Sequence, residues 1–345
     1  MVQKIVNNIL RSRHFWRDVG FDELSELYVS IMLRGLAISL TGLFVPIYML
    51  RLGYDPSSIM MVVAWYFTSR VLLFDFLSGY CVAQFGPKHT MIFGNILLIT
   101  STAMFLTIAS FHWPIWLIGS IWGGSASLFF IPFNVDFSKV KHSKHGGKEL
   151  GYIYVMEKIG TATGPVIGGL IATFFGAQYI FAIATGLLII GLVPLFQTSE
   201  PVRLNQHITF KGLRFDKLKR DYISAAAIGV ENTLCIFLWP LFIGMFILLD
   251  KTAYAKLGLL SSTSILIALF TAYAIGKIID DRKGRYLLRA NATANSFLHL
   301  IRPFINVYPA AFLVGATNEV VTTGYRMPYY KGLFDAADDL PGYRI

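Results

Sequence analysis

Several ionisable residues lie inside long apolar stretches of this sequence, where a charge is costly. At the centre of a membrane span the cost is about 2.5–3.5 kcal/mol, so such residues are candidates for binding a polar solute or carrying a proton. A carboxyl group removed from water can take up a proton near neutral pH, and we expect Glu157 and Glu231 to be the best proton carriers. The residues are Arg34, Arg70, Asp75, Glu157, Glu231 and Glu319.

Two of these residues have opposite charges and equal predicted depths. Counted at about 1.5 Å per residue from the expected helix ends, Arg34 and Asp75 are level on consecutive antiparallel helices. We therefore predict an Arg34–Asp75 ion pair, which leaves Arg70 to pair with Glu157 or with an anionic substrate. Two alternatives stay open: static pairs that only pin helices together, and an Arg34 side chain that extends to the membrane interface.

The composition indicates a membrane protein. Of 345 residues, 55% are hydrophobic and 14% are charged, whereas a soluble domain has about 25% charged residues. This composition argues against a soluble enzyme, a disordered chain, a coiled coil and a free nucleic-acid binder. No catalytic triad, phosphate-binding loop or CxxC pair stands out, so we expect neither an enzyme nor a metal or cofactor site.

Ten apolar segments are long enough to cross a membrane, which takes about 20 residues. The ninth is the weakest, because Asn291, Asn295, His299 and Arg302 interrupt it; such a span fits beside protein or water rather than lipid. The predicted fold is therefore an all-α polytopic membrane protein. The expected spans are residues 28–50, 56–79, 89–109, 113–132, 150–173, 177–196, 222–248, 255–279, 286–303 and 308–326.

Most basic residues fall on one side of these spans. That side includes Arg326, which we assign to the C-terminal tail, whereas the opposite loops hold few basic residues, among them Arg302. The asymmetry predicts that both termini are cytoplasmic. The predicted domains are an amphipathic cytoplasmic N-terminus (1–27), a six-span bundle (28–196), a basic linker (197–221) and an incomplete bundle of about four spans (222–345).

Two loops carry related motifs. The loop after the second span contains Gly79, Gly86 and Lys88, and the loop after the eighth contains a second set of glycine, acidic and basic residues. Two repeats joined by a basic linker are typical of transporters built from parallel repeats. The second set is Asp281, Arg282, Gly284 and Arg285.

The fifth span carries a sharper pattern. Gly160, Gly164 and Gly168 recur at every fourth residue, so they share one helix face on which another helix backbone can approach closely. Pro165 permits a bend, and Gly169 completes the run. A plain helix-packing face is an equally good interpretation, and it is compatible with a functional one.

With these motifs the chain resembles the major facilitator superfamily. The loop motifs are similar to that family's signature at its inner gate, although Ala83 stands where the family has aspartate. The fifth-span motif fits a pattern that is typical of the family's drug–proton antiporters. The arginine that such antiporters often carry in span 4 is replaced here by Gly119.

The resemblance implies a cavity lined by spans 1, 4, 7 and 10. It also implies twelve spans, whereas Ile345 falls where the eleventh would begin, so we expect either a truncated twelve-span transporter or an unusual ten-span protein. The residues that the resemblance places at the cavity are Arg34, Glu231, Asn232, Asn318 and Glu319.

These patterns predict a secondary active transporter that moves a small solute by alternating access, as proton-coupled efflux. We expect a monomer in the cytoplasmic (inner) cell membrane. Its expected partners are a small-molecule substrate, protons and the lipid bilayer, without nucleic acid, cofactor or metal. The alternatives are an inward sugar or anion symporter and a polytopic protein that does not transport, such as a sensor, a scaffold or a degenerate family member.

Overall fold

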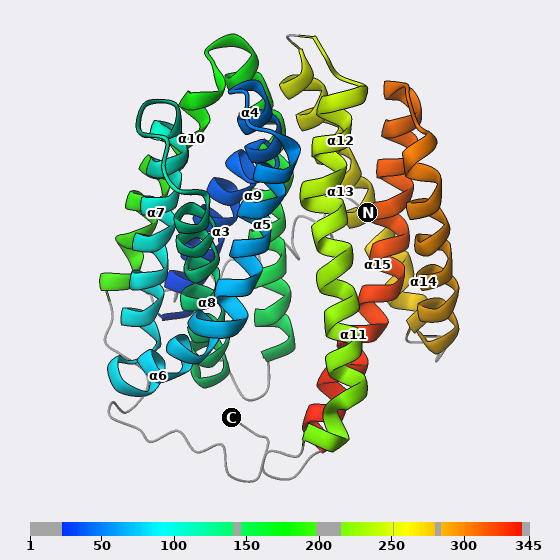
Figure 1. The fold of residues 1–345 in the computed structure, drawn as a ribbon. Helices are drawn as coiled ribbons and strands as arrows, with labels where there is room; N and C mark the ends of the chain where they lie inside the picture. The colour runs from blue at the N-terminus through cyan, green and yellow to red at the C-terminus, as the bar shows by residue number, and fades with distance from the viewer. Residues whose placement is uncertain (1–22, 141–145, 198–214, 251, 280–283, 340–345) are drawn as a thin grey trace, which may run out of the picture.

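The computed structural model describes residues 23–140, 146–197, 215–250, 252–279 and 284–339. These residues form helices and short connections, arranged as two bundles side by side (Figure 1). The all-helical polytopic fold expected from the sequence is confirmed. Seven helical segments within the described residues are long and apolar enough to cross a membrane, and the other three expected spans also form helices, α9, α14 and α15.

The first bundle contains the helices of the first six expected spans. Its first span is α3 with α4, and its second is interrupted by the π-helical segment η1. The elements are α3 (Glu23–Thr41), α4 (Val45–Arg51), α5 (Pro56–Ser69), η1 (Arg70–Phe74), α6 (Asp75–Phe85), α7 (Pro87–Phe111), α8 (Ile115–Val140), α9 (Gly146–Phe174), α10 (Ala177–Leu192) and η2 (Pro194–Phe196).

The second bundle contains, within the described residues, the helices of the last four expected spans. Its first span is interrupted by a second π-helical segment, η3, and such segments are frequent at functional sites. The elements are α11 (Phe215–Thr233), η3 (Leu234–Leu238), α12 (Trp239–Phe246), α13 (Ala253–Ile278), α14 (Gly284–Ile301), η5 (Arg302–Phe304) and α15 (Tyr308–Asp339).

The two bundles meet mainly at one end. We call the end where α10 finishes and α11 begins the linker end, and the end where α4 finishes at Arg51 the far end. At the far end α4 packs on α12, and α9 packs on α13. The backbone amide of Ala255 donates to Thr173 (3.1 Å), and that of Val166 donates to Ser262 (3.1 Å).

The fifth-span glycines create close helix contacts in two directions. A Cβ added to Gly160 would lie 2.7 Å from the Met32 carbonyl oxygen, so this face of α9 packs on the backbone of α3. A Cβ added to Gly169 would lie 2.5 Å from the carbonyl oxygen of Tyr254 in the other bundle. The close approach expected from the spacing therefore occurs both within the first bundle and between the bundles.

The first loop motif forms a tight turn between α6 and α7. Gly86 has a φ of 87°, a conformation that glycine adopts without steric cost, whereas Gly79 lies within α6. Lys88 is buried and forms an ion pair of 3.1 Å with Glu26. Glu26 lies in α3, which already includes Glu23, so the first helix starts earlier than residue 28.

Candidate functional site

The first bundle surrounds one guanidinium group completely. Arg34 on α3 is 2% exposed. It donates to Asn95 Oδ1 on α7 (2.6 Å) and to the carbonyl oxygen of Ser125 on α8 (2.7 Å), and it lies 4.2 Å from the ring centre of Phe129. Arg34 therefore lies inside the first bundle and does not face a cavity between the bundles, contrary to what the resemblance implied.

The predicted ion pair between Arg34 and Asp75 is wrong. Asp75 instead accepts a hydrogen bond of 2.5 Å from Ser127 on α8, and within the described residues no carboxylate lies within 4 Å of Arg34. The helix α8 packs on both α3 and α6, and it supplies Ser125 to one group and Ser127 to the other. Equal depth did not bring the two charges together, because α8 provides the partners of both.

The predicted Arg70–Glu157 pair is also absent. Arg70 Nε donates to Ser127 Oγ and Arg70 Nη1 donates to the Tyr66 hydroxyl, each at 3.4 Å. Arg70 is half-buried and has no carboxylate within 4 Å among the described residues. Two long hydrogen bonds hold this arginine only loosely.

The second bundle contains a larger polar network, centred on Glu231 of α11. One carboxylate oxygen accepts from the Cys235 thiol (3.2 Å) and from the Thr322 hydroxyl (3.3 Å). The other forms an ion pair with Arg326 of α15, which also donates to Asn232. These donors stabilise the ionised form of Glu231, so Glu231 joins the seventh and tenth spans.

The network continues to a second arginine. Arg302 is 7% exposed, donates to Asn318, and lies 4.9 Å from the ring centre of Trp239. It also contacts His299 Nδ1 (3.1 Å) and Cys235 Sγ (3.4 Å). The chain of polar contacts thus links η3, α14, α15 and α11 inside one bundle.

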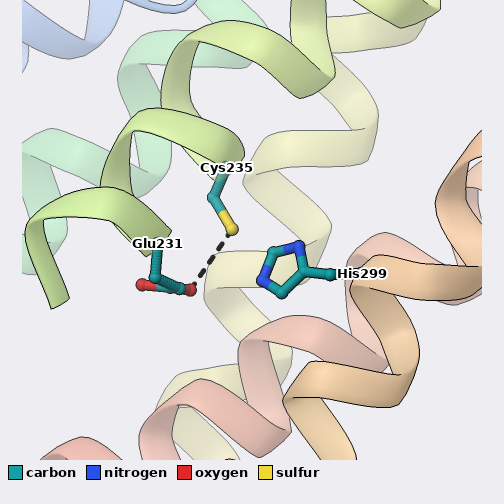
Figure 2. Close-up of side chains that lie close together, drawn as sticks. All are labelled: Glu231, Cys235 and His299. Carbon is teal, nitrogen blue, oxygen red and sulfur yellow. Dashed lines mark hydrogen bonds between the residues drawn. The ribbon is translucent and has the colours of Figure 1, made fainter. Parts of the chain in front are cut away.

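Three ligand-type side chains converge in this network. Figure 2 shows Glu231, Cys235 and His299 pointing toward one another, and their ligand atoms lie within 4.8 Å of each other. A cation does not fit this group, because Arg302 already donates to the thiol sulfur and Arg326 already pairs with the carboxylate. The donor set is therefore part of an arginine-rich network rather than a metal centre.

Two other carboxylates have a different environment. Glu157 on α9 and Glu319 on α15 are half-buried, and neither side chain forms a hydrogen bond or an ion pair with any part of the chain that the structure describes. The Cγ atom of Glu157 lies near Gly35 of α3. Lys158 is exposed and acts electrostatically on both carboxylates. Each bundle therefore has a half-buried carboxylate that forms no hydrogen bond or ion pair with the described residues.

Several network residues were not predicted from the sequence. Arg302 was counted both as a polar interruption of the ninth span and with the loop residues, and Arg326 was assigned to the tail, but α15 continues to Asp339 and Arg302 is buried. A sequence signal existed for Arg302, because it continues the polar stripe of the ninth span at helical spacing. That stripe faces α15: a Cβ added to Gly324 would lie 2.6 Å from the side chain of Asn291. Cys235 and Thr322 were missed as well, and His299 was named only as a polar interruption of the ninth span.

The missing fourth-span arginine has a steric explanation. A Cβ added to Gly119 would lie 2.5 Å from the Val62 carbonyl oxygen of α5, so no arginine fits there. In the second loop motif, Asp281 and Arg282 lie outside the described residues. Gly284 and Arg285 begin α14, where Arg285 is exposed.

Comparisons with known proteins agree with this architecture. The model of the family described as Major Facilitator Superfamily matches residues 27–325. The multi-drug resistance efflux pump PmrA of Streptococcus pneumoniae is 25% identical over 213 residues, which are 59% of this chain and 52% of the relative. The quinolone resistance protein NorA of Staphylococcus aureus is 27% identical over 168 residues, 48% of this chain and 42% of the relative. The chain thus spans about half the length of the curated relatives it matches.

Solved structures share the fold. A D-xylose–proton symporter superimposes with a TM-score of 0.61 at 13% identity, over 89% of this chain and 81% of the other. The nucleoside transporter NupG gives a TM-score of 0.63 at 12% identity, over 94% and 85% of the two chains. At these identities the likeness concerns the fold alone.

Proposed function

Because this chain belongs to the Major Facilitator Superfamily, we propose that it is a secondary active transporter that exports a small amphipathic cation in exchange for protons. Its relatives PmrA and NorA are named as a drug efflux pump and a quinolone resistance protein, which supports efflux of a drug-like solute. We place it in the cytoplasmic membrane as a monomer with both termini inside the cell.

One observation carries the proposal: Glu157 and Glu319 are half-buried carboxylates without a hydrogen-bond or ion-pair partner in the described part of the chain. A carboxyl group in this setting can be neutralised by a proton or by a cation, and it releases one when it takes the other. Such competition is the simplest form of exchange. Glu231, in contrast, already has Arg326 as its counterion, so we assign it to holding the bundle together.

The arrangement of the bundles supports alternating access. Direct contacts between α9 and α13 and between α4 and α12 join the bundles at the far end, and the principal packing partners of α11 and α15 lie within their own bundle. Glu319 lies on α15 and Glu157 on α9, one in each bundle. A rocking motion about the far-end contacts changes the separation of the two carboxylates, which couples their occupancy to conformation.

Flux in proteoliposomes tests this function. Vesicles containing the protein and an acidic lumen should accumulate tetraphenylphosphonium, a permanent lipophilic cation, and should lose that accumulation when a protonophore collapses the pH gradient. Glu319→Gln should reduce the initial rate by about tenfold or more, a loss within the usual range for a proton-transfer group. Glu157→Gln should make the remaining flux less dependent on pH.

Asp55→Asn is the matched control, because it makes the same carboxylate-to-amide change at the exposed start of α5. Asparagine also caps helices, so this variant should transport like the parent. If both glutamine variants retain pH-driven flux, the carboxylate assignment is wrong. If the folded parent protein moves no cation under any gradient, the interpretation as a polytopic protein that does not transport replaces the proposal.

A further inference from the structure

A pocket of about 590 Å³ opens at the far end of the first bundle. Its walls are two connections that are distant in the sequence, the one between α4 and α5 and the one between α7 and α8. Residues 52–54 form the first wall, and Ala109 with residues 112–115 forms the second. The volume lies within the range of small-molecule sites, which is about 300–1,000 Å³.

The first wall has a fixed backbone. Gly53 has a φ of 91°, which glycine adopts without steric cost. The backbone amides of Gly53 and Tyr54 donate to carbonyl oxygens of α4 at 3.0 and 3.1 Å. Asp55 then caps α5 by accepting from the backbone amide of Ser58 (2.9 Å). The wall is therefore held between two helix ends before any ligand binds.

The second wall contains a histidine in an unusual backbone conformation. His112 ends α7 with a φ of 47°, at a position where helices commonly carry glycine. A side chain meets a steric cost in this region, and residues with such conformations are concentrated at functional sites. His112 is exposed and lines the pocket, so the sequence places an imidazole at the pocket where glycine would fit the backbone better.

Trp113 supplies a fixed apolar surface next to His112. Its indole Nε1 donates to the Thr107 hydroxyl (2.9 Å), and its ring stacks on Phe111 with 5.5 Å between the ring centres. The indole N–H is therefore already satisfied, and the ring contributes apolar contact area to the pocket.

Two polar side chains of the lining are available to a ligand. The Tyr54 hydroxyl and the His112 imidazole form no hydrogen bond with the described residues, and each can both donate and accept. No Asp, Glu, Lys or Arg is among the lining residues that the structure describes. The pocket therefore offers hydrogen bonds but no fixed charge to an ionic ligand.

We propose that this pocket binds a small, flat, uncharged aromatic molecule that carries a hydrogen-bonding group, such as a phenol. The apolar residues of the two walls cover the ring, and Tyr54 and His112 bind the polar group. Neither Glu157 nor Glu319 lines the pocket, so the site is separate from the carboxylates that we assign to cation exchange. Binding here does not require that exchange.

Fluorine NMR with 4-fluorophenol tests the proposal. The probe is titrated into the full chain in detergent micelles, and empty micelles correct for its partitioning into the detergent. We expect the protein to broaden the fluorine signal in a saturable way. Fluorobenzene lacks the hydroxyl, so it should bind about fivefold more weakly, which is the effect of losing one hydrogen bond.

A variant that fills the pocket gives the sharpest result. Ala109→Trp should abolish binding, because it places a large side chain in the pocket from an exposed position of α7. Ala182→Trp is the matched control, since it makes the same change at an exposed alanine of α10 outside the lining, and it should bind like the parent. Equal binding in Ala109→Trp and the parent overturns the proposal, as does a signal that the parent broadens no more than empty micelles do.

His112→Gly separates binding from folding. Glycine fits the left-handed backbone at this position, so the melting temperature should not fall, whereas binding should weaken about fivefold with the loss of the imidazole hydrogen bond. Tyr54→Phe should weaken binding by a similar factor, because it removes only the hydroxyl. If both variants bind 4-fluorophenol as tightly as the parent, the polar group has no partner in the pocket and the assigned ligand class is wrong.

Discussion

Among the described residues, each bundle buries one arginine, and the two arginines have similar neighbours. Arg34 in the first bundle and Arg302 in the second both donate to an asparagine side chain and both lie over an aromatic ring. Arg34 completes its contacts with a backbone carbonyl, whereas Arg302 contacts the ionisable side chains of His299 and Cys235.

This difference indicates two kinds of polar core. The contacts of Arg34 join three helices of one bundle and include no group that changes charge. The contacts of Arg302 lead through Asn318 and Thr322 to Glu231, so a change of charge in the second bundle can be transmitted along a chain of side chains. Four predictions test this difference between the bundles, in order of decreasing expected effect.

The largest effect is expected for Glu231→Ala in the second bundle. The change leaves Arg326 without its counterion and removes the acceptor used by Thr322 and Cys235. Loss of one partner of a buried pair costs about 3–5 kcal/mol. We expect a loss at the lower end, about 3 kcal/mol, because the Arg326 side chain is 27% exposed and water can solvate its charge. The measurement is the free energy of unfolding in detergent micelles.

The double variant Glu231→Ala with Arg326→Leu is the control for that experiment. It removes both charges, so it should recover more than half of the lost stability. If the double variant is as unstable as the sum of the two single variants, the pair is not coupled, and the second bundle does not differ from the first in the way that we infer.

A smaller effect is expected for Arg34→Met in the first bundle. The change leaves Asn95 Oδ1 and the Ser125 carbonyl without their donor, which costs about 1–3 kcal/mol for each buried group. It also removes a buried charge that has no acidic partner, which offsets part of the loss. We expect a net loss of about 1–2 kcal/mol, measured by the same unfolding experiment.

Adding Asn95→Leu should restore part of the stability of Arg34→Met, because the unsatisfied acceptor then disappears. A loss for Arg34→Met that exceeds the loss for Glu231→Ala contradicts the comparison. It would mean that the first bundle also depends on a charge interaction.

Sequence information identified the spans well and the polar contacts poorly, for a physical reason. Hydropathy and the spacing of Gly160, Gly164 and Gly168 depend on single helices, so they are read directly from the chain. The pairing of Arg34 with Asp75 depended on which helices are neighbours, and depth along the membrane normal does not contain that information. Arg326 was missed because α15 extends beyond its apolar part.

The contacts between the bundles should depend on smaller energies. Ser262→Ala removes the hydroxyl that accepts from the Val166 amide across the bundle interface. Loss of such a hydrogen bond costs about 1 kcal/mol, which corresponds to about a fivefold change in the ratio of two conformations. Distances between spin labels at the far ends of α4 and α12 should therefore show more separated bundles.

Thr163→Ala is the control, because the Thr163 hydroxyl forms hydrogen bonds only within α9. An equal change of the label distances in that variant would show that they do not report on the interface.

The smallest effect is expected at Asp250, where the bundles meet outside the helices. Hydrogen bonds from Lys256 (2.7 Å) and Thr252 (2.9 Å) lower the pKa of the Asp250 carboxyl, and its backbone carbonyl accepts from Arg51 of the other bundle (2.6 Å). A lowered pKa means that this stabilisation is complete at neutral pH and is lost as the pH falls through the pKa of the folded state. The melting temperature of the parent protein should therefore fall slightly more on acidification than that of Asp250→Asn. The difference should be small, because both side chains of the Lys256–Asp250 pair are about half exposed.

The contrary result is a melting temperature that falls equally with pH in the two proteins. Asp250 would then act only through its backbone contact with Arg51, and the contact between the bundles would be insensitive to charge.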